Sequence, residues 1–353
     1  MSANPDRGKV MTVDGPLDPA ELGATLTHEH ILLDLRSYCP EPADAAARAR
    51  MEAPLTLANL GEARRDPMRV RDNMLIDDRE LAVAEMQRFA EFGGSTIVDV
   101  SPVGIQMTGV DEIAALCRQA GLKAVVSSAF YVRPAHPPEV AERSVESIAE
   151  QFVFEALEGI GGTGIRSGMI GEIGISQPGH PDEWKVLEAA CRAQLQTGLP
   201  LCVHPYFGQR SRVAPEVARF VLERGVDPSR LNLCHMDGFM DLDFQRRVLD
   251  MGAYISFDTF GFEIYYDDAP DLNHNAHDSA RCRHLMALLE LGYADQLLVS
   301  QDVCTKMQYR AFGGLGYSHL LENIWPRLRG EGVPQEVLDR LLIGNPRRYM
   351  TIA

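Results

Sequence analysis

The chain has 353 residues, enough for one large α/β domain or two small ones, and its 45% hydrophobic and 24% charged residues are typical of globular proteins. Its net charge of −16 argues against nucleic acid and against an anionic membrane surface as partners. The first 17 residues contain no apolar core segment, so we expect no signal peptide. No apolar run approaches the length needed to span a membrane, and the seven cysteines form no CxxC pair. We therefore expect a cytoplasmic protein with reduced thiols.

Eight short stretches have the composition of buried β-strands. Most are near-continuous apolar runs, the pattern of strands in a parallel sheet that is covered on both faces. In chain order they are ATLT (24–27), STIVDVS (95–101), LKAVVSS (122–128), SGMIGEIG (167–174), LPLCVH (199–204), RLNLCH (230–235), AYISFDT (253–259) and QLLVSQD (296–302).

Amphipathic stretches separate several of these strands, and each ends at or near a glycine, a common helix stop. They are DDRELAVAEMQRFAEFGG (77–94), GVDEIAALCRQAG (109–121), DEWKVLEAACRAQLQTG (182–198) and APEVARFVLERG (214–225). An alternation of strand and helix that recurs eight times predicts an α/β fold of the (β/α)8 TIM-barrel type. The main alternative, an open doubly wound sheet, would need a glycine-rich GxGxxG loop after an early strand, and no such loop follows the early strands here.

The predicted elements form one domain over residues 1–353. Residues 36–70 follow the first strand and are rich in Ala, Arg and Pro, and we expect them to be an insertion on the C-terminal face of the barrel. Residues 318–350 have a helical pattern. We expect this tail to break at its prolines and to close the barrel as a C-terminal helical extension.

The stretch TLTHEH ends the first predicted strand with two histidines. His28 and His30 point to the same side because side chains alternate along a strand, whereas Glu29 points to the other side. Two solvated histidines at a strand end are the ordinary explanation of an HxH pattern alone. Two neutral imidazoles on one face also suit a shared metal ion, so the other strand ends must decide.

Four further residues of the kinds that bind metals lie in or at the ends of other predicted strands. Glu172 lies inside the apolar fourth strand, where an unpaired carboxylate is costly. The others are His204, His235 and Asp302, at the ends of the fifth, sixth and eighth strands. Each could be a buried hydrogen-bonded residue or, for Asp302, a helix cap. Because a TIM barrel gathers the C-terminal ends of its strands on one face, the six residues together predict a metal site.

The ordered set TLTHEH, GMIGEIG, LCVHP, LCHMDG and LLVSQD resembles the phosphotriesterase-related family of the amidohydrolase superfamily. The tail GVPQEVLDRLLIGNPRRYM resembles the end of that family's members, so the resemblance covers residues 25–350. It implies a distorted (β/α)8 barrel with two divalent metal ions, usually zinc. It also implies the ligands: His28, His30 and Asp302 for the buried ion, His204 and His235 for the exposed ion, and a bridging carboxylate from the fourth strand.

The chain departs from phosphotriesterase itself in the fourth strand. Phosphotriesterase has a carboxylated lysine there, but this strand has none, and Lys185 lies at the start of the next helix. Glu172 must therefore supply the bridge, as in the branch of the family called phosphotriesterase homology proteins. The departure argues against organophosphate hydrolysis as the native activity.

Two metal ions that share one water lower its pKa from 15.7 toward about 7 and so generate a hydroxide nucleophile. The exposed ion would stabilise the developing oxyanion, and Asp302 is the candidate general base and proton shuttle. We expect a binuclear zinc hydrolase of a carboxylic ester, lactone or small amide. The alternatives are a phosphotriester hydrolase and a non-catalytic barrel that binds a ligand. Because the chain keeps all six ligand positions, the sequence favours the enzyme.

Loops after the strands are expected to line the substrate pocket, with ordinary loop packing as the alternative for each of their residues. The candidates are Tyr131, Arg133, His136, Phe260, Phe262, Tyr265 and Tyr266. Arg133 could pair with an acidic group on the substrate. His274 and His277 could form a further metal pair, although a solvated polar loop is the simpler explanation. We expect a small-molecule substrate and a homodimer.

No serine or cysteine nucleophile is required by this scheme. Cys202, Cys234 and Cys304 lie near strand ends. We interpret them as small apolar packing residues, the usual role of free cysteine, with a zinc thiolate as the less favoured alternative.

Overall fold

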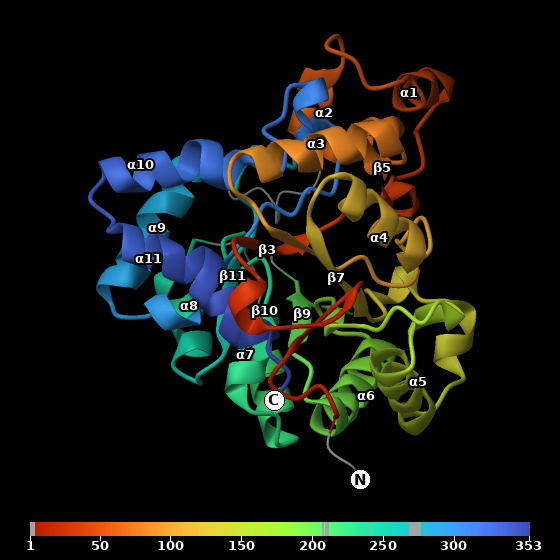
Figure 1. The fold of residues 1–353 in the computed structure, drawn as a ribbon. Helices are drawn as coiled ribbons and strands as arrows, with labels where there is room; N and C mark the ends of the chain where they lie inside the picture. The colour runs from red at the N-terminus through yellow and green to blue at the C-terminus, as the bar shows by residue number, and fades with distance from the viewer. Residues whose placement is uncertain (1–3, 207, 209–211, 239, 268–276) are drawn as a thin grey trace.

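The structure, a computed structural model, describes residues 4–206, 208, 212–238, 240–267 and 277–353. Eight parallel strands curl into a nearly closed barrel at its centre, with helices around the outside (Figure 1). In chain order the barrel strands are β3 (Thr25–Glu29), β6 (Thr96–Asp99), β7 (Lys123–Ser128), β8 (Met169–Ile175), β9 (Leu201–Pro205), β10 (Leu231–Leu233), β11 (Tyr254–Phe257) and β12 (Leu297–Val299).

The barrel strands lie side by side in chain order, from β3 to β12. All neighbouring pairs are parallel. The backbone N–H of Asp302, just after β12, donates to the carbonyl oxygen of His28 in β3 at 3.3 Å and so connects the last strand to the first. The predicted TIM-type barrel is confirmed, and each of the eight predicted stretches overlaps with one of its strands.

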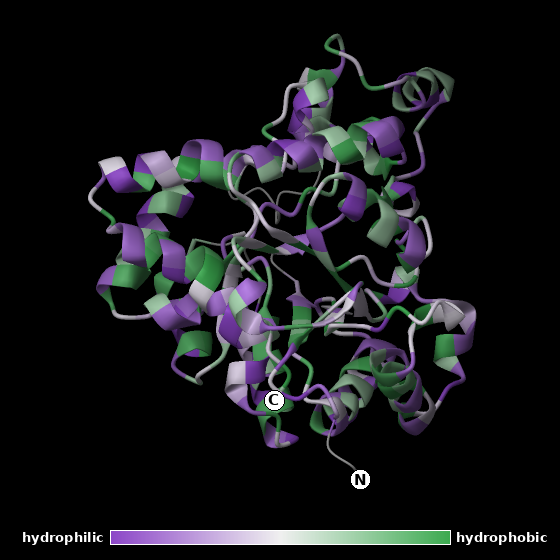
Figure 2. Cartoon of the chain, viewed as in Figure 1, coloured by the Kyte–Doolittle hydropathy of each residue, from purple (hydrophilic) through white to green (hydrophobic). Residues whose placement is uncertain are grey.

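The connecting helices each bury one side toward the barrel, and green and purple residues alternate along them in Figure 2. They are α3 (Arg79–Glu91), α4 (Val110–Gln119), α5 (Val145–Leu157), α6 (Pro181–Thr197), α7 (Val213–Glu223), α8 (Leu242–Leu249) and α9 (Asp278–Glu290). In α4 the buried side carries Ile113, Ala114 and Cys117, which follow helical spacing. The carboxylate of Asp78 and the hydroxyl of Ser144 accept N–H bonds at the starts of α3 and α5, so local sequence also fixes where helices begin.

The interior of the barrel is a separate apolar cluster. It is built from Val10, Leu22, Val98, Val100, Val125, Met169, Cys202, Cys234, Tyr254, Leu298, Tyr349 and Met350. Cys202 and Cys234 are fully buried in it, as expected for packing residues. A hairpin of β1 (Val10–Thr12) and β2 (Gly15–Leu17), which the sequence did not predict, supplies Val10 from the N-terminal side of the barrel.

The segment 36–70 lies between β3 and α3. It contains two short helices, α1 (Ala45–Met51) and α2 (Leu60–Arg65), and a short antiparallel pair, β4 (Leu33–Asp34) with β5 (Leu75–Ile76), flanks it. Its apolar side chains pack against the loop after β11 and against the segment after β12. This wall cluster consists of Leu55, Leu60, Ala63, Val70, Phe262, Ile264, Tyr266 and Met307.

The tail is helical, as predicted, with α10 (Trp325–Gly330), α11 (Gln335–Asp339) and α12 (Asn345–Met350). The expectation that it breaks at each proline is wrong for Pro326 and Pro346. A wider π-helical turn directly precedes α10 and another precedes α12, and the chain stays helical through both prolines. The helix is interrupted only before Pro334, which caps α11.

Among the described residues, no helix combines the length and the apolarity needed to cross a membrane. The homodimer remains a prediction, and so does the treatment of residues 36–70 as an insertion in a single domain.

Candidate metal centre

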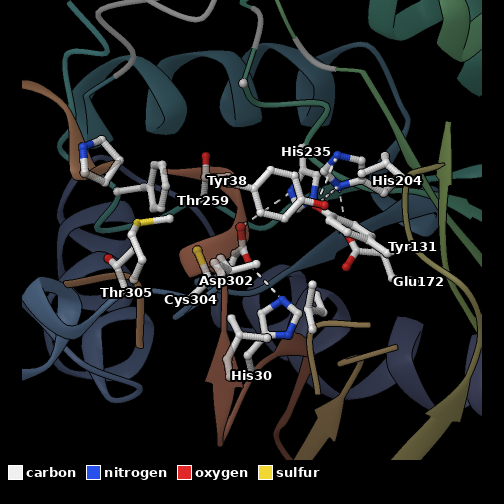
Figure 3. A pocket seen from close by; sticks show the side chains of 18 of the residues that line it. His30, Tyr38, Tyr131, Glu172, His204, His235, Thr259, Asp302, Cys304 and Thr305 are labelled. Atoms are coloured by element: carbon white, nitrogen blue, oxygen red, sulfur yellow. Dashed lines mark hydrogen bonds and ion pairs between the residues drawn. The ribbon is translucent and has the colours of Figure 1, made fainter. Parts of the chain in front are cut away.

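The six predicted ligands converge at one end of the barrel. His28 lies in β3, Glu172 in β8 and His204 in β9. His30, His235 and Asp302 directly or closely follow β3, β10 and β12. All six are less than a tenth exposed. Figure 3 shows the five that it labels, His30, Glu172, His204, His235 and Asp302, around one cavity at the barrel mouth.

Two groups of potential ligands share His28. In the first group, His28, His30 and Asp302 offer atoms that all lie within 4.8 Å of one another. The Oδ1 atom of Asp302 is 3.2 Å from Nε2 of His30 and 3.8 Å from Nε2 of His28. The second group contains His28, Glu172, His235 and also Cys234, the residue before His235.

A single oxygen of Glu172 faces three imidazoles. Its Oε1 atom lies 2.7 Å from Nδ1 of His204, 3.2 Å from Nε2 of His235 and 3.6 Å from Nε2 of His28. Glu172 is 1% exposed, so water cannot compensate its charge. The carboxylate therefore lies between the two halves of the site, where a bridge between two ions would have to be.

Two of the predicted ligands have an unusual backbone conformation. His235 has φ 54° and Asp302 has φ 47°, which is the left-handed region that non-glycine residues avoid at a cost of roughly 1–2 kcal/mol. Both residues come just after a barrel strand ends. The left-handed turn keeps their side chains directed at the barrel mouth, and strain of this kind is concentrated at functional sites.

Asp258, just after β11, holds the His235 ring in place. Its Oδ1 atom accepts the backbone N–H of His235 at 2.9 Å and lies 3.0 Å from Nδ1 of the ring. An Nδ1–H that donates to Asp258 leaves Nε2 of His235 free of a proton on the side of Glu172, which is the state of a metal ligand. In the same way, the Ser101 hydroxyl lies 2.9 Å from Nδ1 of His30, and Nε2 of His30 faces Asp302.

Glu29 points away from the two histidines beside it, as predicted, and it connects β3 to the segment after β12. It accepts hydrogen bonds from the Ser300 hydroxyl at 2.7 Å and from the backbone N–H groups of Gln301 and Val303 at 2.8 and 2.9 Å. Burial raises its pKa to about 8, although these hydrogen bonds oppose the shift. Glu29 therefore positions the segment that carries Asp302.

At three of the six residues, His28, Glu172 and Asp302, the electrostatics favour the protonation states that metal ligands need. Burial lowers the pKa of His28 to about 3, which keeps its imidazole neutral. Burial raises the pKa of Glu172, but the imidazoles of His28 and His204 outweigh it and hold this pKa well below its usual range. Burial also opposes ionisation of Asp302, and the His30 ring outweighs it and lowers the Asp302 pKa. Both carboxylates are therefore ionised at neutral pH.

A divalent metal ion fits the residues that are present. Both ring nitrogens of His28 are buried and have no hydrogen-bond partner among the described residues. A neutral imidazole with unpaired nitrogens beside two ionised carboxylates is an unstable arrangement without a cation. Burial lowers the pKa of His235, but the neighbouring Asp258 and Glu172 raise it well above its usual value, so a cation would replace a proton at that ring.

A cavity of about 340 Å³ opens above the six residues. Its walls are mainly apolar and come from the segment 36–70, from the loop after β7 and from the loop after β11. The apolar lining residues include Leu33, Leu35, Tyr38, Met68, Met74, Ile105, Tyr131, Val132, Phe262, Ile264 and Tyr266. The Tyr131 hydroxyl lies 3.3 and 3.4 Å from the ring nitrogens of His204. The Tyr38 hydroxyl is buried and has no hydrogen-bond partner among the described residues.

The structure places the predicted substrate residues in two classes. Tyr131 and Phe262 line the cavity, and so does Tyr266. Arg133, His136 and Tyr265 are not among the described lining residues.

Each of these three side chains has another role in the loops. Nε of Arg133 lies 3.1 Å from the Asp182 carboxylate. Nε2 of His136 contacts the carbonyl oxygen of Tyr131 at 2.6 Å and so holds the loop that presents Tyr131. Tyr265 is 42% exposed, and its neighbours turn inward instead.

The other loop candidates are placed as follows. Phe260 is buried in the main core, and His277 contacts Glu263, while His274 lies outside the described residues. Cys304 lines the cavity.

Sequence reasoning missed Asp258, Tyr38 and Met68. Asp258 ends the seventh predicted strand, so the rule that selected the other strand ends would also have found it. Tyr38 and Met68 lie in the segment 36–70, whose sequence has no periodicity that indicates which side chains face the site.

Comparisons with known proteins agree with this geometry. The model of the phosphotriesterase family matches residues 8–350. An N-acetyltaurine hydrolase from Tetraodon nigroviridis is 35% identical over 349 residues, which cover 98% of each chain. The crystal structure of a resiniferatoxin-binding protein from Rhodobacter sphaeroides is 36% identical, with a TM-score of 0.94 over 99% of this chain and 98% of that one. A phosphotriesterase homology protein from Escherichia coli is 28% identical, with a TM-score of 0.77 over 94% and 99% of the two chains.

Proposed function

The chain belongs to the phosphotriesterase family, and on that premise we propose that it is a hydrolase that uses two divalent metal ions to cleave a carboxylic amide, ester or lactone. The observation that carries the proposal is the position of Glu172, with one carboxylate oxygen within 3.6 Å of three histidine rings. A buried carboxylate among imidazole rings is a ligand set for cations of the zinc type.

We assign the ligands as two overlapping sets. His28, His30 and Asp302 would hold one ion, His204 and His235 would hold the other, and Glu172 would bind both. Zinc is the metal that we propose, because imidazole nitrogens and carboxylate oxygens suit it. When bound, the two ions would polarise the substrate carbonyl and lower the pKa of a shared water.

The chain's own side chains account for proton transfer. Asp302, ionised and at the edge of the cavity, can take a proton from the attacking water. The oxygen of that water bonds to the carbonyl carbon, and the bond from this carbon to nitrogen or oxygen then breaks. Asp302 returns the proton to the leaving group. Burial raises the pKa of the Tyr131 hydroxyl well above its usual value, so Tyr131 stays protonated and can donate a hydrogen bond to the substrate.

The relatives support carbonyl chemistry more than phosphotriester chemistry. The N-acetyltaurine hydrolases are named for an amide substrate, and the similarity to them covers almost the whole chain. The carboxylated lysine of phosphotriesterase is replaced by Glu172. A purely ligand-binding role is the second candidate, because a similar structure is that of a resiniferatoxin-binding protein. The full ligand set favours the enzyme.

The test combines metal counting with turnover on one protein preparation. The protein is stripped with a chelator, reloaded with zinc and assayed on a panel of N-acyl amines, esters, lactones and phosphotriesters. We expect about two zinc ions per chain and hydrolysis of carboxylic substrates that disappears on stripping. A protein that binds two zinc ions and hydrolyses none of the panel would favour the ligand-binding role. A protein that binds none would refute the metal site.

A further inference from the structure

Apart from the histidines, the cavity wall has a single cationic side chain among its described residues, that of Arg281 in α9. Arg281 is 2% exposed, and its guanidinium already has partners. Nε donates to the Thr259 hydroxyl at 3.0 Å, Nη1 to Asp278 at 3.1 Å and Nη2 to the carbonyl oxygen of Phe262 at 3.2 Å. Asp237 lies 3.3 Å from Nε. The positive charge of Arg281 is therefore matched by buried carboxylates before any ligand arrives.

Two cationic residues next to the lining, Lys306 and Arg133, are paired as well. Lys306 follows the lining residue Thr305, and its ammonium group lies 2.6 Å from Asp72 and 3.4 Å from Asp77. Arg133 follows the lining residue Val132 and is paired with Asp182. Apart from the ligand histidines, the described wall of the cavity therefore offers no cation that is free of a carboxylate.

A large part of the cavity wall is apolar. Met68 comes from the segment 36–70, and Ile264 and Phe262 come from the loop after β11. The wall cluster joins these two segments, so the surface is packed. An uncharged hydrocarbon or aromatic group gains free energy on such a surface, whereas an anion placed there loses its hydration without gaining a counter-charge.

We propose that this site takes substrates whose part remote from the scissile bond is uncharged and apolar, and that it disfavours substrates that end in an anion. The proposal deepens the proposed hydrolase function and rests on it for the position of the scissile bond. It separates this chain from the N-acetyltaurine hydrolases that it resembles, because the taurine part of their named substrate ends in a sulfonate.

The test uses a pair of compounds of nearly equal shape. One is N-acetyltaurine, and the other is N-acetyl-2-(methylsulfonyl)ethylamine, in which a methyl group replaces one oxygen of the sulfonate and removes the charge. Binding of each to the zinc-loaded full chain is measured by calorimetry, and kcat/KM is measured separately. We expect the neutral sulfone to bind at least tenfold more tightly. A series of N-acetyl alkylamines is expected to gain about fourfold in affinity per methylene, which corresponds to about 0.8 kcal/mol for each buried CH2.

A charge introduced into the wall provides the second arm. Met68→Lys is expected to shift the ratio of N-acetyltaurine affinity to sulfone affinity at least tenfold toward N-acetyltaurine. Met68→Gln, of similar length and without charge, is expected to leave the ratio within threefold of the parent's. The ratio is insensitive to partial loss of folded or zinc-loaded protein, because both ligands report on the same sites.

The outcomes distinguish this proposal from the hydrolase function. If the sulfone binds preferentially and neither compound is hydrolysed, the preference for neutral ligands stands and the hydrolase assignment fails for this substrate pair. If N-acetyltaurine binds as tightly as the sulfone, if the sulfone does not bind, or if longer alkyl chains bring no gain, the proposal is overturned.

Discussion

Replacement of Asp258 separates the charge of this residue from its hydrogen bonds. Oδ1 of Asp258 accepts both the backbone N–H of His235, at 2.9 Å, and the Nδ1 side of its ring, at 3.0 Å. An asparagine can retain both contacts through its amide oxygen; it loses the charge and puts an NH2 group in place of Oδ2, which lies 3.6 Å from Nδ1 of His28. An alanine loses both contacts and leaves a buried backbone N–H without a partner, at a cost of about 1–3 kcal/mol.

We expect the two variants to differ in zinc affinity and to affect chiefly one ion. Mutation of a residue that orients a metal-binding histidine typically lowers metal affinity about 10–100-fold. Asp258→Asn is expected at the low end and Asp258→Ala at the high end, which correspond to about 1.4 and 2.8 kcal/mol at 1.4 kcal/mol per tenfold. The ion that His235 holds should be lost, whereas the ion held by His28, His30 and Asp302 should remain.

The assay is zinc content per chain across a series of buffered free-zinc concentrations, with circular dichroism to confirm folding. Ser256→Ala is a suitable control, because Ser256 is also buried at the end of β11 but its hydroxyl bonds Asn232 rather than a ligand. If Asp258→Ala keeps both zinc ions at the parent's affinity, Asp258 does not orient His235 and the assignment of His235 as a ligand is in doubt.

Two further predictions concern the site, and a third concerns Glu85, a buried residue of α3. Glu172→Gln should weaken the binding of both zinc ions together, and retention of both ions by the variant would contradict the bridging role. Reconstitution of the parent protein with zinc should not depend on added bicarbonate. Tyr38→Phe should lower kcat/KM about tenfold with unchanged zinc content, because the unpaired hydroxyl is available to the substrate; unchanged kinetics would exclude that contact. Burial raises the pKa of Glu85, so the folded state binds a proton on this carboxyl more tightly than the unfolded state does. The stability that Glu85 contributes is therefore fully present below its unfolded pKa and is lost as pH rises through its folded pKa. Glu85→Gln should therefore match the parent's melting temperature near pH 4 and exceed it near pH 8, and a pH-independent difference would contradict the shift.

The barrel and the convergence of the six proposed ligands at one end of it could be predicted from sequence because they depend on local patterns. Most barrel strands are apolar runs, and in a TIM barrel the C-terminal ends of the strands share one face, so polar residues at these ends are expected to lie together there. His204 and Asp302 were found in this way, and Glu172 was found because a carboxylate is costly inside an apolar strand. The same rule applies to Asp258, which follows a clear strand and should have been included.

The cavity walls could not be predicted, because they depend on how loops pack on one another. Tyr265 was expected at the substrate, but the loop turns its neighbours Ile264 and Tyr266 inward. Arg133 was expected to meet an acidic substrate, but Asp182, at the start of α6, already neutralises it. No local pattern in either loop distinguishes the inward from the outward side chain. The helical path through Pro326 was missed for a similar reason, since a π-helical turn has no clear sequence signature.

Because the wall cluster joins the segment 36–70 to the loop after β11, the surface that would bind a substrate is structurally separate from the residues that would bind metal. The six proposed ligands lie in or just after the barrel strands, whereas much of the surface that a substrate would touch belongs to segments that pack on each other. Substitutions at positions such as Met68 or Ile264 can therefore change which molecules are accepted while the barrel and its ligands stay as they are. In a family with this architecture, mutations in one region can change the substrate specificity and leave the reaction unchanged. Homologues that share all six proposed ligands therefore need not share a substrate.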